Sequence, residues 1–104
     1  MIIQVPIIVE EMNQVDSIQM DVVYDGNIAA VQDVMKSEAT NNFLLLYNVT
    51  LSSSDENIVR IGLISTDKIN GTETVVYILF ETEASAVPIE IKGLILNDTF
   101  VMGR

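Results

Sequence analysis

Residues 17–24, SIQMDVVY, alternate between two kinds of side chain along their whole length. Every second residue is large and apolar: Ile18, Met20, Val22 and Tyr24. The residues between them are mostly polar: Ser17, Gln19, Asp21 and Val23. Successive side chains of a β-strand point to opposite faces of a sheet, so this stretch predicts a strand with one buried face. The turn sequence Asp25-Gly26-Asn27 follows it and predicts that the chain reverses there.

Similar segments recur on both sides of this strand. Further strands are predicted at residues 2–9, 28–34, 43–51, 58–65 and 74–82, and a last apolar stretch at residues 88–102. A helical turn is the alternative for residues 28–34. Polar segments that predict turns separate them: residues 11–16, 36–42, 52–57, 67–72 and 83–87. Pro6 cannot donate to a strand ladder, so the first strand is expected at an edge or a bulge, and Gly93 predicts a bulge in the last stretch. Roughly seven or eight strands about 8–15 residues apart predict an all-β fold, a two-sheet β-sandwich.

The composition limits what this fold can do. A chain of 104 residues predicts one domain, residues 1–104, and 49% apolar against 19% charged residues argues against disorder. Histidine and cysteine are both absent, so the commonest general base, the commonest metal ligand and any thiolate chemistry are missing. No calcium-binding loop of the D-x-D-x-D-G type occurs, and the acidic residues in turns are expected to be solvated. We therefore predict a protein that is not an enzyme, with no catalytic residues and no metal site of its own.

Charge and hydropathy exclude two further classes of partner. The net charge of -10 repels phosphate backbones, so nucleic-acid binding is not expected. No run of about 20 apolar residues exists, so membrane insertion is not expected either.

Several segments, taken in order, resemble a cohesin domain, the dockerin-binding module of cellulosome-type scaffolds and of related archaeal and bacterial surface proteins. They are VPIIV at 5–9, MDVVYDGNIAAVQDV at 20–34, IVRIG at 58–62, VVYILFET at 75–82, and VPI at 87–89 leading to LILND at 94–98. No single motif is specific, and their order along the chain carries the resemblance. Three features depart from the pattern. Only residues 1–4 precede the first motif, so the usual first strand is lacking or lies outside this sequence. Gly26 replaces the usual proline, and the outer positions of the closing hairpin, usually rich in threonine and lysine, are Tyr77, Leu79 and Glu81.

The resemblance implies a jelly-roll-type sandwich with a partner-binding surface on the outer face of one sheet. Cohesins use that face for a dockerin, a small pair of helices loaded with calcium, so calcium is expected in the partner. Matched by position, the face would comprise Ser17, Gln19, Asp21, Val23, Arg60, Ile64, Tyr77, Leu79 and Glu81. The chain is then expected to be a module excised from a larger extracellular or cell-surface protein, assembling complexes of the kind used in polysaccharide catabolism.

The alternation of side chains predicts the same face independently. Odd-numbered or even-numbered positions of a strand share one face, and we call each such set a parity. Four apolar side chains lie on the parity of their strand that should face solvent: Val23, Ile64, Tyr77 and Leu79. If they lie side by side, they form an apolar patch with a polar rim, the usual anatomy of a protein interface. Residues 43–47 are apolar on both parities, so Leu44 or Leu46 could extend the patch. The alternative is that a loop or a further strand covers these residues.

Two other functions remain open at this point. A carbohydrate-binding module would need a flat aromatic strip, for which only Tyr47 and Tyr77 are available once the other aromatic residues are assigned to the core. A structural module of a surface-layer or adhesin-type protein would bind nothing in isolation.

Overall fold

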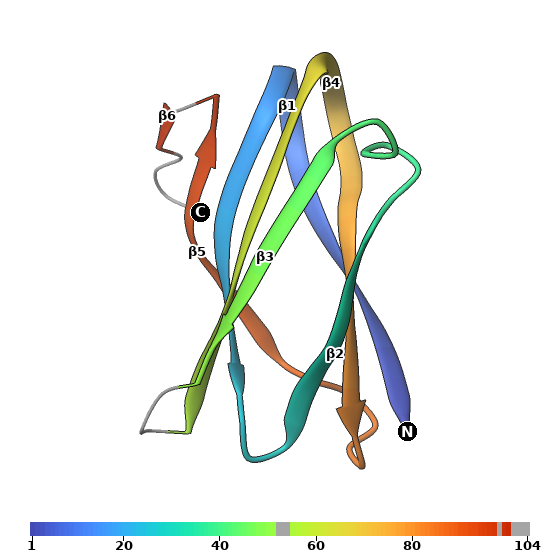
Figure 1. Ribbon diagram of the computed structural model, residues 1–104, viewed down its shortest axis with the longest axis vertical. Coiled ribbons are helices and arrows are strands. Elements are labelled where there is room, and N and C mark those ends of the chain that lie inside the picture. The colour runs from blue at the N-terminus through green and yellow to red at the C-terminus, as the bar shows by residue number, and fades with distance from the viewer. Residues whose placement is uncertain (52–54, 98, 101–104) are drawn as a thin grey trace.

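A computed structural model describes residues 1–51, 55–97 and 99–100 of the chain, all in strands, turns and loops (Figure 1). The predicted turn at residues 52–57 lies partly outside these residues, as does the end of the last apolar stretch. The strands are β1 (Ile2–Asp25), β2 (Ala29–Lys36), β3 (Leu44–Thr50), β4 (Glu56–Thr82), β5 (Ile89–Leu96) and β6 (Thr99–Phe100).

Two long strands organise the fold. β1 and β4 run antiparallel along nearly their whole lengths, from Ile2 opposite Glu81 to Asp25 opposite Glu56. Residues 2–9 of β1 and 73–82 of β4 join β2, and we call this the β2 layer. Residues 17–25 of β1 and 56–64 of β4 join β3, β5 and β6, and we call this the β3 layer. Since both long strands pass from one layer to the other, the hydrogen-bonded sheet folds over on itself (Figure 1).

The core lies between the two layers. The apolar parity of residues 17–24 is fully buried, as the alternation predicts. Tyr24 of the β3 layer meets Phe80 of the β2 layer edge to face, with ring centroids 5.1 Å apart. Edge-to-face packing at this distance is a favourable aromatic geometry. Contact between rings from opposite layers makes the fold a β-sandwich, and the predicted all-β, two-sheet architecture is confirmed.

Two predicted turns are wrong. Residues 11–16 and 67–72 lie inside β1 and β4, where they pair with each other at the bend between the layers. Polar residues interrupt the register there, and Glu11 and Gln14 adopt φ values of 52° and 54°. Met12 and Val15 nevertheless remain in the core. The polar residues therefore produce β-bulges, which bend a strand without ending it.

Two other local predictions are confirmed. Residues 2–9 of β1 pair with β4 alone within the described parts of the chain, so Pro6 lies in an edge strand. Gly93 has a φ of 61° and coincides with the register shift between β1 and β5, as expected of a bulge.

The side chain of Asn97 holds the irregular part of β1 in place. Its Oδ1 accepts hydrogen bonds from the backbone N–H groups of Asp16 at 2.8 Å and Ser17 at 3.2 Å. Its Nδ2 donates to the carbonyl of Gln14 at 2.7 Å. Asn97 itself has a φ of 50°, a conformation that asparagine tolerates better than most residues.

We expect Asn97→Ala to lower the free energy of unfolding by about 1–2 kcal/mol, because several backbone groups lose their partner. Urea denaturation measures this loss. Asn97→Gly is the control, since glycine adopts the same φ freely but makes none of these hydrogen bonds. If Asn97→Gly were as stable as the unaltered chain, the side-chain hydrogen bonds would contribute nothing.

Candidate docking face

The nine residues predicted to form one face lie on two faces of the sandwich. Six of them belong to the outer side of the β3 layer: Ser17, Gln19, Asp21, Val23, Arg60 and Ile64. The strand register places Ser17 beside Ile64 and Asp21 beside Arg60. Tyr77, Leu79 and Glu81 belong instead to the β2 layer, where they lie between β1 and β2. The prediction of a single nine-residue patch is therefore wrong.

The reason is the continuity of β4. Residues 58–65 and 74–82 were predicted as two strands joined by a loop, which could have returned the chain to the same sheet. In the structure they are two halves of one strand that bends from one layer into the other. The outward parities of these halves therefore face opposite sides of the sandwich.

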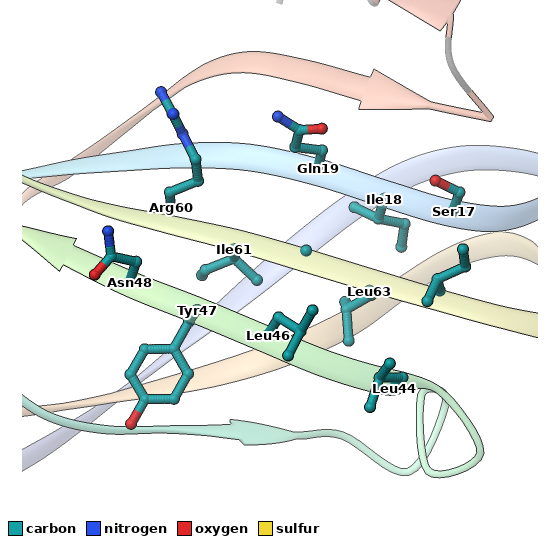
Figure 2. A pocket seen from close by; sticks show the side chains of 12 residues that line it. Ser17, Ile18, Gln19, Leu44, Leu46, Tyr47, Asn48, Arg60, Ile61 and Leu63 are labelled. Carbon is teal, nitrogen blue, oxygen red and sulfur yellow. The ribbon is translucent and has the colours of Figure 1, made fainter.

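The outer side of the β3 layer carries an exposed aliphatic patch at one end. Leu44 is 58%, Leu46 is 65% and Ile64 is 57% exposed. Leu44 lies opposite Ile64, and Leu46 lies opposite Gly62, which in turn lies opposite Gln19 of β1. We define the docking face by six residues: Ser17, Gln19, Leu44, Leu46, Gly62 and Ile64. They line a shallow hollow of about 370 Å³ together with neighbouring residues (Figure 2).

The sequence predicted this face only in part. Leu44 and Leu46 appeared as optional additions to the patch, yet they are its most exposed members beside Ile64. The sequence does indicate their exposure, because residues 43–47 are apolar on both parities and only one parity can face the core. Val23 was expected to be exposed, but it is only 7% exposed, between its cross-strand neighbours Ile58 and Glu90.

A charged row borders the docking face. Arg60 extends over β1 (Figure 2) and donates from Nε to Oδ1 of Asp21 at 2.8 Å and from Nη2 to Oδ2 at 3.0 Å. Two parallel bonds of this kind fix both side chains more firmly than a single contact does. They hold the pKa of the Asp21 carboxyl below its ordinary value of 3.8, although partial burial acts in the opposite direction.

This shift has a defined consequence for pH dependence. Because the carboxyl of Asp21 has a lower pKa in the folded chain than in the unfolded chain, its ionisation stabilises the fold above about pH 3.8. That contribution is lost as the pH falls through the lowered pKa. In a titration followed by NMR at the Asp21 side-chain carboxyl carbon, we expect Arg60→Gln to raise this pKa. Lys92→Gln is the control, because Lys92 lies opposite Asp21 on β5 but does not contribute to the shift. An Asp21 pKa that does not respond to Arg60→Gln would contradict the assignment.

The charged side chains on the outer side of the β3 layer lie outside the docking face. Strand register places six of them on this side: Arg60, Lys92, Asp21 and Glu90, with Asp25 and Glu56 at the end away from Ile64. The full chain carries a net charge of -10. The docking face itself has no ionisable side chain, so contact with it would depend on apolar groups and neutral hydrogen bonds.

The structure argues against an aromatic strip. Tyr77 lies in the β2 layer, whereas Tyr47 lies in β3 and its hydroxyl donates to the Asp33 carboxylate of β2 at 3.3 Å. The two tyrosines therefore do not form the flat platform that a carbohydrate-binding module would need.

Within residues 1–51, 55–97 and 99–100, acidic side chains do not gather in threes that could hold a metal ion. The same part of the chain contains no helix with the length and apolar character needed to cross a membrane.

Comparisons with known proteins identify the fold. No family model matches the chain, and no curated protein matches it. A solved non-cellulosomal cohesin from the hyperthermophilic archaeon Archaeoglobus fulgidus is similar, with a TM-score of 0.72 and 23% identity over 94% of this chain and 68% of that one. CaCohA2 in complex with CaDoc0917, a cohesin bound to a dockerin, is similar with a TM-score of 0.68 and 19% identity, over 96% of this chain and 81% of that one. The solution structure of CaCohA2 from Clostridium acetobutylicum is similar with a TM-score of 0.64 and 21% identity, over 93% of this chain and 70% of that one. The chain therefore has the cohesin fold, as the sequence resemblance implied.

Proposed function

We propose that this chain is a non-catalytic interaction module that binds a dockerin-like protein through the docking face. The observation that carries the proposal is the exposure of Leu44, Leu46 and Ile64 on one sheet surface. Exposed aliphatic clusters of this kind mark protein interfaces, because burial of apolar area is the main source of association free energy. The polar residues Ser17, Gln19 and Asn48 at the border of the hollow match the polar rim of such interfaces.

The similarity to a cohesin solved with a dockerin supports the class of partner. A dockerin-like module presents helices, and a sheet face that is already hydrogen-bonded within its layer accepts side chains of a helix more readily than an added strand. Calcium would belong to the partner. The setting we propose is extracellular or at the cell surface, in the assembly of larger complexes.

Catalysis is not part of the proposal. The sequence has no histidine or cysteine, and Asp21, a carboxylate that borders the docking face, is engaged by Arg60. Neither the Asp21 carboxylate nor the Arg60 guanidinium is poised to transfer a proton near neutral pH.

Calorimetric titration with dockerin-like modules from the same genome tests the proposal. We expect one-to-one binding with a dissociation constant in the micromolar range or tighter in calcium, and loss of binding when a chelator removes calcium. Absence of binding to every such module in calcium would contradict the proposal and favour a structural role or a glycan ligand.

A further inference from the structure

Gly62 is a bare position at the centre of the docking face. It lies in the middle of one half of β4, with Leu46 of β3 opposite it on one side and Gln19 of β1 on the other. Figure 2 shows Leu46 and Gln19 on the strands that flank β4, with Leu44 and Arg60 farther along the face. Two strand spacings separate Leu46 from Gln19, roughly 10 Å between backbones. Between these side chains the floor of the hollow is the backbone of β4.

The fold itself does not require glycine at this position. Among the glycines that the structure describes, Gly71 and Gly93 have positive φ, so the backbone of Gly62 has a conformation open to other residues. A Cβ added to Gly62 would meet nothing nearer than the carbonyl oxygen of Leu46 at 3.9 Å, an ordinary van der Waals contact. Glycine also weakens a strand interior, because it loses more backbone freedom on folding and supplies no side chain to pack. Stability alone would therefore favour a larger residue.

We infer that Gly62 is the floor of a socket for one large apolar side chain projecting from a partner helix, an inference that rests on the proposed function. Glycine inside a strand is typical of sites where another molecule approaches the backbone closely. A helix about 10–12 Å across, side chains included, matches the span from β3 across β4 to β1. A space of about 150 Å³ holds a benzene-sized group, so the hollow of about 370 Å³ accommodates a leucine, methionine or phenylalanine side chain.

The chemistry of the socket selects an apolar occupant. Leu46 and Ile64 supply exposed aliphatic walls, and Gln19 supplies a neutral polar one. Arg60 is the charged side chain at the hollow, and its guanidinium is held by Asp21. A charged side chain inserted here would lose water without gaining a partner of opposite charge, which is unfavourable.

Gly62→Val tests the socket, because valine fills it and also suits a strand. The probe is the dockerin-like module that binds the unaltered chain in calcium. We expect the urea midpoint of Gly62→Val to equal or exceed that of the unaltered chain, while the dissociation constant rises at least tenfold. Gly62→Ala should show a smaller loss of affinity in the same direction. Thr50→Val, on the same strand face but away from the socket, is the matched control and should leave affinity unchanged.

Different outcomes separate the socket from the proposed function. If Gly62→Val bound as tightly as the unaltered chain, the socket would be wrong although the docking function stands. If Gly62→Val lowered the urea midpoint clearly, glycine would be required by the fold, and the inference would be overturned. If the unaltered chain bound no dockerin-like module in calcium, the proposed function would fail and the socket with it.

Discussion

Leu46→Asp is expected to weaken binding of a dockerin-like module at least a hundredfold. Leu46 is 65% exposed beside Gly62 on the docking face, so an aspartate there would be solvated in the free chain but desolvated in the complex. The few residues that dominate an interface lie near its middle and cost about 2 kcal/mol or more when truncated, and about 1.4 kcal/mol corresponds to a tenfold change in affinity. The free energy of unfolding should change by less than about 1 kcal/mol, because the side chain lies outside the core.

The matched control for this variant is Ile8→Asp. Ile8 is 51% exposed, but it belongs to the part of β1 in the β2 layer, away from the docking face. Both variants add one negative charge and remove one exposed aliphatic side chain, so long-range charge effects are similar. Calorimetric titration should show lost affinity for Leu46→Asp and retained affinity for Ile8→Asp. The reverse result would transfer the binding surface to the β2 layer.

Phe80→Ala is expected to have the largest effect on stability, about 3–5 kcal/mol of unfolding free energy. The side chain of Phe80 is fully buried and packs against Tyr24 across the two layers. Its removal would leave a cavity at the contact that joins the layers. A typical domain has only about 5–15 kcal/mol in total, so the variant would be close to unfolding under mild conditions.

Urea denaturation followed by circular dichroism measures this effect. With a slope of about 1–3 kcal/mol/M, the midpoint should fall by about 1–5 M. Leu51→Ala is the control, because Leu51 is 74% exposed and should change the midpoint little. A loss below about 1 kcal/mol for Phe80→Ala would contradict the packing of the two layers on each other.

Alternation was enough to predict the all-β class and the buried faces of the strands. The buried parities in β1 and β4 follow directly from the sequence, because a half-buried strand imposes a period of two on its side chains. Pro6 and Gly93 were placed correctly for the same kind of reason, since each restricts what a strand can do locally. The cohesin fold then followed from the order of the segments.

The docking face was less predictable, because parity says which residues share one side of a strand but not which layer that side belongs to. Residues 67–72 have the composition of a loop, yet they continue β4 through the bend opposite the bulges of β1. This continuity separates Tyr77, Leu79 and Glu81 from the rest of the predicted face. Single-sequence patterns do not distinguish a bulged, bent strand from two strands with a turn, because both place polar residues between apolar runs.

We propose that the outer side of the β3 layer, and not that of the β2 layer, meets the partner. Mapping amide chemical shifts of the isotope-labelled chain during titration with a binding dockerin-like module in calcium tests it most directly. We expect the largest changes on β3, on residues 58–65 of β4 and on residues 17–23 of β1. Largest changes on β2 and on residues 74–81 of β4 would contradict this docking surface.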